Sequence, residues 1–480
     1  MSEIPCPVAV HAARDPDSVA LAGPSINYSY RDLDTAVSMV AKNLRAGGIR
    51  RGDIVALHLS SCVEYPILLL GVIRLGAIAF PLNTHLPAAG IVSALESVRC
   101  SNLIAAADLL PPKTSASIRV FAPRDVLASR HTIRPRLERV TTDRPAVIVM
   151  TSGSSGQPKA AVLTYGNLHA NASASNASLP LAPGNRWLLS LPLYHVSGLG
   201  VVFRCIVAGA TIAIAEGHEE LPESITRCAV GHISLVATQL IRLMQQQPAA
   251  EALTSLKAIL LGGSALPASM LRAALERGLP IYISYGLTEM ASQVATARLT
   301  ELSPDQRPAA RVLIPRSVRI NAESEIEVQG PTLFRGYLRG DSVSRPLTAD
   351  GWFRTGDLGR LDASNGLIVL GRKDNMFISG GENIQPEEIE ALLSGIDGIA
   401  QTVVVPVKDP VYGHRPVAFI EPVSEQCPDS AALTEILART LPPYKIPRVY
   451  LPWPTELRGQ GIKVNRKRLA QRAEELAGQP

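Results

Sequence analysis

Apolar residues along the chain follow two alternating patterns, helical spacing and short continuous runs. Residues 29–46 carry apolar side chains at helical spacing behind Ser29, which can cap the first turn, and residues 62–75 are expected to form another helix. Short apolar runs typical of buried strands occur at 54–59, 77–81, 146–150, 187–191, 211–215, 258–261 and 281–284. This alternation predicts an α/β fold of layered subdomains with largely parallel strands.

The pattern changes after Val318. Strands expected at 325–328, 351–354 and 367–369 are polar and separated by turns, which is typical of antiparallel pairing and predicts a β-rich subdomain. A small α+β unit is expected beyond Arg372, with helices at 386–393 and 430–441 and strands at 401–407 and 416–421. We therefore place a boundary between residues 372 and 375, which divides the chain into a large domain, 1–372, and a small domain, 373–480.

Composition places the chain among globular proteins. Its 480 residues are too many for one ordinary domain. Of these, 46% are apolar and 19% are charged, a composition too apolar for a disordered chain. The net charge of +5 suits polyanionic small substrates and does not by itself indicate nucleic acid. The six cysteines are scattered without metal-ligand spacing, which favours a reducing, cytoplasmic compartment. Residues 65–82 are the most apolar stretch, but Arg74 interrupts them, so a buried helix and strand are expected instead of a membrane span.

The first candidate for chemistry is the loop 151–159, Thr-Ser-Gly-Ser-Ser-Gly-Gln-Pro-Lys, which follows an expected strand. Its hydroxyls, its glycine backbone amides and Lys159 could hold a phosphate group. The spacing is not that of a Walker P-loop, because Ala160 stands where Ser or Thr should follow the lysine. A flexible Ser/Gly linker is the alternative, and the apolar runs on both sides argue against it.

Further blocks follow in order: Tyr285-Gly-Leu-Thr-Glu289, Thr355-Gly-Asp357, Gly371-Arg-Lys-Asp-Asn375, Ser379-Gly-Gly-Glu-Asn383 and Gly461-Ile-Lys-Val-Asn-Arg466. Taken singly, these are ordinary turns, helix starts or a basic tail. Together with the 151–159 loop they resemble the acyl-adenylate-forming superfamily of acyl-CoA synthetases, nonribosomal-peptide adenylation domains and firefly luciferase. The resemblance extends over nearly the whole chain. It implies an AMP-forming acid–thiol ligase with an N-terminal adenylation domain and a small mobile C-terminal domain.

The resemblance also implies a role for each block. The ATP-binding residues would be Thr151, Ser152, Gly153, Ser154, Ser155, Gly156, Lys159, Tyr285, Gly286, Asp357 and Arg372. The catalytic residues would be Thr288, Glu289, His195 and Lys463, with Glu289 as the ligand of Mg²⁺. Asp374 would be the hinge between two half-reactions, and Gly380 and Gly381 would line the tunnel for coenzyme A.

The catalytic lysine departs from the family pattern at one point. Lys463 keeps the family spacing of three residues before Arg466, but Ile462 separates it from Gly461. Lys467 therefore stays an alternative to Lys463.

Residues 190–204 contain the candidate acid site. Arg204 is the only charged residue in 198–215, and a buried charge needs a partner, either a protein carboxylate or a substrate with a second carboxylate. This block, with 261–264 and 380–388, resembles the o-succinylbenzoate–CoA ligase branch of the superfamily, whose substrate is an aromatic dicarboxylate. The acid-binding residues implied are Ser197, Arg204, Gly262, Gly263 and Gln239. His195, which the resemblance places at the tunnel between acid and thiol, could equally be a satisfied core histidine.

Other functions stay open at this point. The chain could activate an aryl or medium-chain monocarboxylate, in which case Arg204 would have a protein partner, or it could bind nucleotide without catalysis. The expected partners are ATP, coenzyme A and an aromatic dicarboxylic acid, in menaquinone biosynthesis. No nucleic acid and no membrane span are expected, and the sequence leaves the oligomeric state open, a homo-oligomer included.

Overall fold

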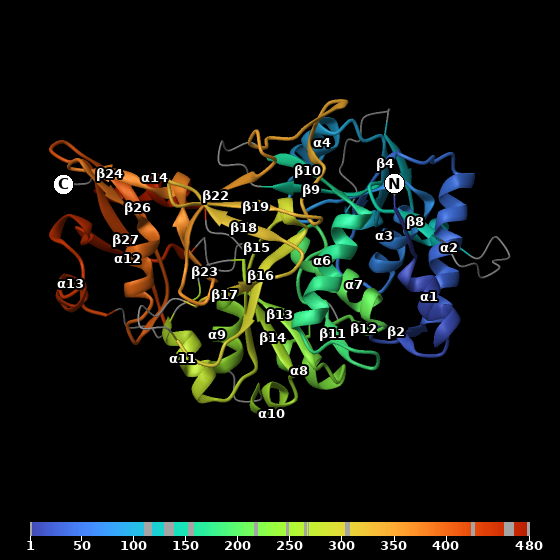
Figure 1. Cartoon of the computed structure of the whole chain (residues 1–480), viewed down its shortest axis with the longest axis horizontal. Coiled ribbons are helices and arrows are strands. Elements are labelled where there is room, and N and C mark those ends of the chain that lie inside the picture. Colours follow the sequence, from blue (N-terminus) through green and yellow to red (C-terminus); the bar gives the residue numbers. More distant parts are fainter. Residues whose placement is uncertain are drawn as a thin grey trace.

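A computed structural model describes residues 2–109, 118–128, 139–151, 158–215, 219–245, 249–263, 266, 268–302, 308–423, 428–455 and 465–477. Figure 1 shows the N-terminal residues in layered helices and strands at one end of the molecule and the C-terminal residues in a lobe at the other. The helices are α1 (Pro7–Arg14), α2 (Tyr30–Ala46), α3 (Glu64–Leu75), α4 (Ala88–Ser97), α5 (Pro123–Leu127), α6 (Tyr165–Ser178), α7 (Val196–Ala208), α8 (Leu221–Arg227), α9 (Ala237–Gln245), α10 (Ala249–Thr254), α11 (Ala268–Glu276), α12 (Pro386–Leu393), α13 (Ser430–Ala438) and α14 (Arg466–Ala477). Four 3₁₀ turns are described as well, η1 (Ala107–Leu109), η2 (Thr288–Met290), η3 (Lys373–Asn375) and η4 (Pro443–Lys445).

An eight-stranded sheet forms one layer. Its order is β21 (Ser342–Ser344), β20 (Gly336–Arg339), β10 (Lys159–Thr164), β9 (Pro145–Thr151), β5 (Ile78–Pro81), β4 (Ile54–His58), β6 (Asn102–Ala105) and β7 (Arg119–Phe121). The strands from β9 to β7 pair in parallel, whereas β10, β20 and β21 add an antiparallel edge. A separate short pair joins β1 (Glu3–Pro5) to β8 (Arg139–Thr141).

A thirteen-stranded sheet forms the other layer. Its order is β18 (Ser317–Ile320), β19 (Glu325–Gln329), β22 (Phe353–Leu361), β23 (Gly366–Arg372), β17 (Ala310–Val312), β16 (Ser292–Arg298), β15 (Ile281–Leu287), β14 (Ala258–Leu261), β13 (His232–Leu235), β11 (Arg186–Leu188), β12 (Thr211–Ala213), β2 (Val19–Ala22) and β3 (Asn27–Ser29). The strands from β15 to β2 are parallel. The polar strands after Val318 are antiparallel, as predicted, but they continue this sheet.

The expected elements are largely present. Helix α2 begins directly after Ser29, whose hydroxyl accepts from the Asp32 N–H while the Asp32 carboxylate accepts from the Ser29 N–H. The strand expected at 187–191 ends earlier, at Leu188, and the strand expected at 281–284 continues to Leu287. Residues 65–82 form most of α3 and the whole of β5, and no helix in the described part of the chain has the length and apolar character of a membrane span.

The C-terminal residues have cores of their own. Strands β26 (Ile399–Asp409), β27 (Gly413–Pro422) and β28 (Val449–Pro452) form a three-stranded sheet, and β24 (Phe377–Ser379) pairs with β25 (Glu382–Ile384). Side chains alternate across the sheet: Val404 packs toward α12 and α13, and Val403 and Val405 pack toward α14. The sequence periodicity therefore produces a sheet covered by helices on both faces. The mobility of this unit stays a prediction.

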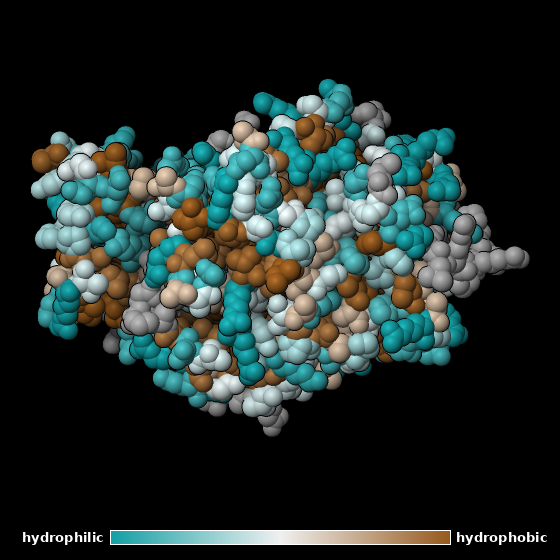
Figure 2. Space-filling model, in the orientation of Figure 1, coloured by the Kyte–Doolittle hydropathy of each residue, from teal (hydrophilic) through white to brown (hydrophobic). Residues whose placement is uncertain are grey.

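Figure 2 shows a largely hydrophilic surface around the rim of the molecule. Hydrophobic residues gather near the middle of the same face, where Figure 1 places the strands of the thirteen-stranded sheet. The carboxyl ends of its parallel strands lie at one edge, and open α/β sheets bind ligands at such edges.

Candidate active site

Asp357 connects two other residues predicted to hold the adenosine of ATP. Tyr285, near the end of β15, donates its hydroxyl to Asp357 Oδ2 at 2.7 Å, and Arg372 Nη1 donates to Asp357 Oδ1 at 2.9 Å. Asp357 and Arg372 face each other across β22 and β23. Burial, and then the Asp357 carboxylate, raise the pKa of Tyr285 well above its ordinary value, so the phenol stays protonated. The structure thus brings together three residues that are up to 87 positions apart in the sequence.

Hydrogen bonds to the neighbouring strand β19 fix the segment that carries Asp357. The Thr355 hydroxyl donates to the Ile326 carbonyl at 2.7 Å, and the Gly356 N–H donates to Glu325 Oε1 at 2.9 Å. Glu325 is only 4% exposed, so the sheet holds a buried carboxylate directly against this turn. Glu325 Oε2 also lies 3.4 Å from Lys373 Nζ at the predicted hinge.

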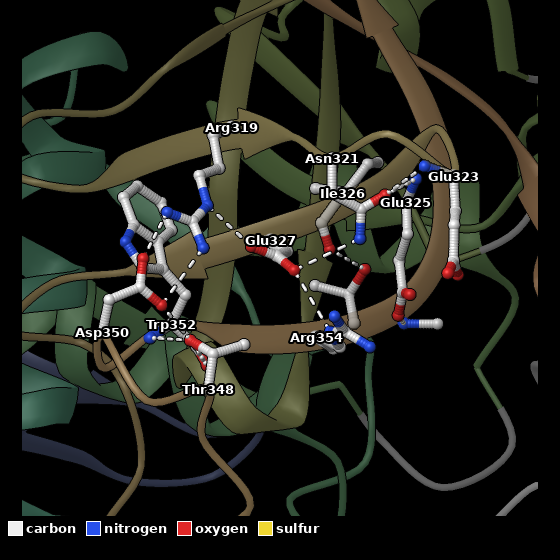
Figure 3. Close-up of polar contacts among 12 residues, drawn as sticks. Arg319, Asn321, Glu323, Glu325, Ile326, Glu327, Thr348, Asp350, Trp352 and Arg354 are labelled. Atoms are coloured by element: carbon white, nitrogen blue, oxygen red, sulfur yellow. Dashed lines mark hydrogen bonds and ion pairs between the residues drawn. The ribbon is translucent and has the colours of Figure 1, made fainter.

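Glu327 performs a similar structural role two residues along the same face of β19. Figure 3 shows its carboxylate between Arg319 and Arg354. The Nε atoms of these arginines donate to it at 2.6 Å and 3.2 Å, and Arg319 also pairs with Asp350 at 2.6 Å. Glu327 is 1% exposed, so these partners compensate its burial and hold β18, β19 and β22 together.

Glu289, the predicted metal ligand, follows the end of β15. Thr288 and Glu289 form η2 immediately after β15, and Tyr337 of β20 donates its hydroxyl to Glu289 Oε1 at 2.5 Å. Among the described residues, only Tyr337 hydrogen-bonds this carboxylate, and no cluster of three metal-ligating side chains occurs. One partly exposed carboxylate suits Mg²⁺, which is commonly held by one or two carboxylates together with phosphate oxygens and waters.

The phosphate loop itself is described only at its ends. Ser152, Gly153, Ser154, Ser155 and Gly156 lie outside the described residues, as does Lys463. Thr151 and Lys159 face each other across the antiparallel pair β9 and β10, and Thr151 Oγ1 lies 3.4 Å from the Lys159 carbonyl oxygen. The strand expected before the loop is therefore confirmed, and the apolar run after it forms β10.

Arg204 lies in α7 and is buried, with 1% of its surface exposed. Its Nη1 donates to Gln293 Oε1 at 2.5 Å, and its guanidinium lies 4.6 Å from the centre of the Trp187 ring. Burial lowers the pKa of Arg204 to about 10, so it remains charged at neutral pH. In the described part of the chain neither of these partners is a carboxylate, and the buried Nε of Arg204 has no hydrogen-bond acceptor.

The partners of Arg204 belong to a buried polar network. Gln293 Oε1 also accepts from the Ser175 hydroxyl at 2.6 Å, and Gln293 Nε2 donates to Thr296 Oγ1 at 2.6 Å. The sequence predicted a carboxylate partner from the protein or the substrate, whereas the protein supplies an amide oxygen and an aromatic face. Nothing in the sequence pattern of Gln293, Trp187 or Tyr337 indicated these contacts.

The other acid-site residues lie at the ends of neighbouring elements. His195 is the N-cap of α7, with its ring 4.7 Å from the Tyr194 ring, and Ser197 lies in the first turn of the helix. Gly262 and Gly263 follow β14, and Gln239 accepts from the Val236 N–H at 3.1 Å at the start of α9. These positions lie at the carboxyl ends of parallel strands, but the side-chain oxygen of Gln239 is already used locally.

Gly380 and Gly381 form a two-residue turn between β24 and β25. Their φ angles are +59° and +89°, which explains the glycine pair by turn geometry alone. Asp374, the predicted hinge residue, lies in η3, where its Oδ2 is 3.5 Å from Arg372 Nη2. Roles in a coenzyme A tunnel and in a hinge stay predictions.

Comparison with known proteins places these features in a family. The family model described as AMP-binding enzyme matches residues 8–338, and the model for the AMP-binding enzyme C-terminal domain matches residues 388–457. The chain belongs to the AMP-binding enzyme family. The superfamily resemblance inferred from the motifs is confirmed.

The relatives of this AMP-binding enzyme include curated 2-succinylbenzoate–CoA ligases. The one from Salmonella typhimurium is 34% identical over 443 residues, which are 92% of each chain. The one from Escherichia coli K12 is 32% identical over 455 residues, covering 94% of this chain and 95% of the relative.

Solved structures of o-succinylbenzoate CoA synthetases are similar to this chain over nearly its whole length. The o-succinylbenzoate CoA synthetase from Bacillus subtilis in complex with its acyl-adenylate intermediate matches with a TM-score of 0.85 at 28% identity, covering 98% of both chains. The same synthetase in complex with ATP and a magnesium ion matches with a TM-score of 0.83 at 28% identity, covering 94% of this chain and 96% of that one.

Proposed function

We propose that this AMP-binding enzyme is a 2-succinylbenzoate–CoA ligase of menaquinone biosynthesis. It would activate o-succinylbenzoate with ATP and pass the acyl group to coenzyme A, releasing pyrophosphate and AMP. The observation that carries the proposal is the likeness to 2-succinylbenzoate–CoA ligases over more than nine-tenths of both chains.

In the first half-reaction the acid carboxylate attacks the α-phosphorus of ATP, and the bond to pyrophosphate breaks. Two anions meet in this step, so the site must neutralise charge and align the attack. Tyr285, Asp357 and Arg372 would hold the adenosine, and Thr288 would donate to the α-phosphate. A magnesium ion, when bound, supplies positive charge at the phosphates. Glu289 would hold that ion, and Lys463 would bring a mobile cation to the transition state.

In the second half-reaction the thiol of coenzyme A attacks the acyl carbonyl carbon, the bond to AMP breaks, and the thiol proton is lost. We assign the rotation between the two steps to a hinge at Asp374, and the approach of the thiol to the turn at Gly380 and Gly381.

The acid site would use Arg204 for the carboxylate that is not activated. Its buried Nε lacks an acceptor among the described residues, and an unsatisfied buried donor costs roughly 1–3 kcal/mol. A second carboxylate on the substrate, or a water that it holds, would remove that cost. Ser197 lies in the first turn of the same helix, where the backbone N–H groups have no partners within the helix and could receive an anion.

A second candidate keeps the chemistry and changes the acid. Gln293 and Trp187 already hold Arg204, which favours a ligase for an aryl monocarboxylate in which Arg204 is a structural residue. The two candidates differ in which acid stimulates turnover.

The test is an acid panel with ATP and coenzyme A, followed by separation of AMP, ADP and pyrophosphate. We expect AMP and pyrophosphate to form with o-succinylbenzoate and much more slowly with benzoate or octanoate. AMP formation with benzoate but none with o-succinylbenzoate would support the second candidate and reject the first.

We also place the reaction in the cytoplasm. The five cysteines in the described ranges are free, as expected in a reducing compartment.

A further inference from the structure

Tyr337 lies between two groups assigned to the phosphates of ATP. Its hydroxyl donates to Glu289 Oε1 at 2.5 Å, and the face of its ring lies 5.3 Å from Lys159 Nζ. Lys159 lies in β10, Glu289 in η2 and Tyr337 in β20. More than a hundred residues of sequence separate Lys159 from Glu289. One aromatic side chain therefore contacts both the candidate metal ligand and the lysine of the phosphate loop.

The backbone fixes Tyr337 firmly. Strand β20 pairs with β10 so that Tyr337 is opposite Ala161, two residues beyond Lys159. The Phe334 N–H donates to the Glu289 carbonyl at 2.7 Å, which ties the approach to β20 directly to η2. The buried Phe334 ring packs edge-on against the Tyr337 ring, with 4.8 Å between ring centres. Strand pairing and the packing of Phe334 thus fix the position of the Tyr337 side chain.

This placement has a chemical consequence for Glu289. The carboxylate is partly exposed, and without a partner it could adopt several rotamers. A phenol donating to one oxygen fixes the plane of the carboxylate and leaves the other oxygen for a hard cation. The ring face attracts the Lys159 ammonium and limits where it can lie.

We infer that Tyr337 is a positioning residue for the ATP site: its hydroxyl orients Glu289 toward the magnesium ion, and its ring holds Lys159 beside the phosphates. The inference rests on the roles that the proposed function gives to Glu289 and Lys159. It does not depend on which acid is activated.

The test is ATP binding to the full chain by calorimetry over a series of Mg²⁺ concentrations, without any acid. Tyr337→Phe keeps the ring and removes the hydroxyl. Loss of a group that orients a metal ligand typically weakens metal affinity by roughly 10–100-fold. We therefore expect the Mg²⁺ midpoint, the Mg²⁺ concentration that gives half of the metal-dependent gain in ATP affinity, to rise about tenfold. Metal-free ATP affinity should stay unchanged, because the ring still faces Lys159. Tyr337→Leu should weaken metal-free ATP binding as well.

Three comparisons make the result decisive. Tyr450→Phe removes a hydroxyl that contacts Thr434 in the C-terminal unit, and it should leave the Mg²⁺ midpoint unchanged. Glu289→Gln should raise the midpoint, and adding Tyr337→Phe to it should add little, because both changes act on one carboxylate. A wild-type midpoint in Tyr337→Phe, with a raised midpoint in Glu289→Gln, would overturn this inference alone. A wild-type midpoint in Glu289→Gln would overturn the metal assignment of the proposed function together with it.

Discussion

At the scale of single residues, Arg204 shows what a sequence can reveal about a buried charge. Its position in an apolar segment predicted burial and the need for a partner, and the structure confirms that it is buried. The partner could not be predicted, because Gln293 lies 89 residues away in β16 and reaches Arg204 through the packing of α7 against that strand. Gln293 is also uncharged, so no pattern of opposite charges in the sequence could indicate the pair.

The role of Arg204 can be tested with a substitution that keeps the charge. Arg204→Lys loses the planar fork and the contact with Trp187. A charged hydrogen bond contributes about 1.5–3 kcal/mol, so KM for o-succinylbenzoate should rise roughly tenfold or more while KM for ATP changes little. Steady-state kinetics with each substrate varied in turn measures both values.

Arg186→Lys is the matched control, because Arg186 is a partly buried arginine one residue from Trp187 that donates to the Cys228 carbonyl. It should leave both KM values near wild type. If Arg204→Lys raises KM for ATP as much as KM for the acid, Arg204 is a structural residue.

The residues predicted to bind ATP were also only partly accessible to sequence analysis. Tyr285, Asp357 and Arg372 were identified from separate short motifs, and the structure brings them within hydrogen-bond distance. Tyr337 was missed, because its role comes from strand pairing between β10 and β20 and from no motif considered in the sequence. Contacts between distant segments are thus the part of the site that local patterns do not contain.

At the scale of elements, periodicity predicted most helices and strands but not their connections. Helix α12 has the predicted bounds, since Pro386 at its first position and acidic residues in its first turn are strong start signals. Strand β15 runs three residues beyond its prediction because Tyr285, Gly286 and Leu287 pair with β16. That extension carries Thr288 and Glu289 to the site. It was missed because Ser284 and Gly286 interrupt the apolar run on which the prediction was based.

Helix α14 is attached to the C-terminal sheet by an ion pair. Arg466 donates to both carboxylate oxygens of Glu390, at 2.5 Å and 2.7 Å, and to the Val404 carbonyl at 2.9 Å. Glu390 is only 5% exposed, so Arg466→Met should leave a buried charge unpaired at a cost of about 3 kcal/mol. Native-state hydrogen exchange should show faster exchange of the α14 amides.

Because Arg466 follows the predicted catalytic Lys463 by three residues, the same variant should also slow acyl-adenylate formation. Arg472→Met is the control on the same helix, since Arg472 forms an exposed pair with Glu475 that contributes little. Equal exchange rates in the two variants would contradict a docking role for Arg466.

At the scale of the whole molecule, two units meet around the candidate hinge. Lys373 contacts Glu323 and Glu325 of the large unit, and Ser269 of α11 donates to the Ser394 carbonyl at 2.6 Å. Contacts of this polar kind are typical of interfaces that can separate. Such an interface would let the C-terminal unit present Lys463 in one step and the turn at Gly380 in the other.

The central claim is that the acid attacks the α-phosphorus of ATP. It can be tested most directly with o-succinylbenzoate labelled with ¹⁸O in its carboxylates, in a full turnover with ATP and coenzyme A. When the thiol displaces AMP from the acyl group, one carboxylate oxygen stays on the phosphate. Mass spectrometry should therefore find one ¹⁸O in the AMP and none in the pyrophosphate. Unlabelled AMP, or ¹⁸O in inorganic phosphate together with ADP, would contradict the account.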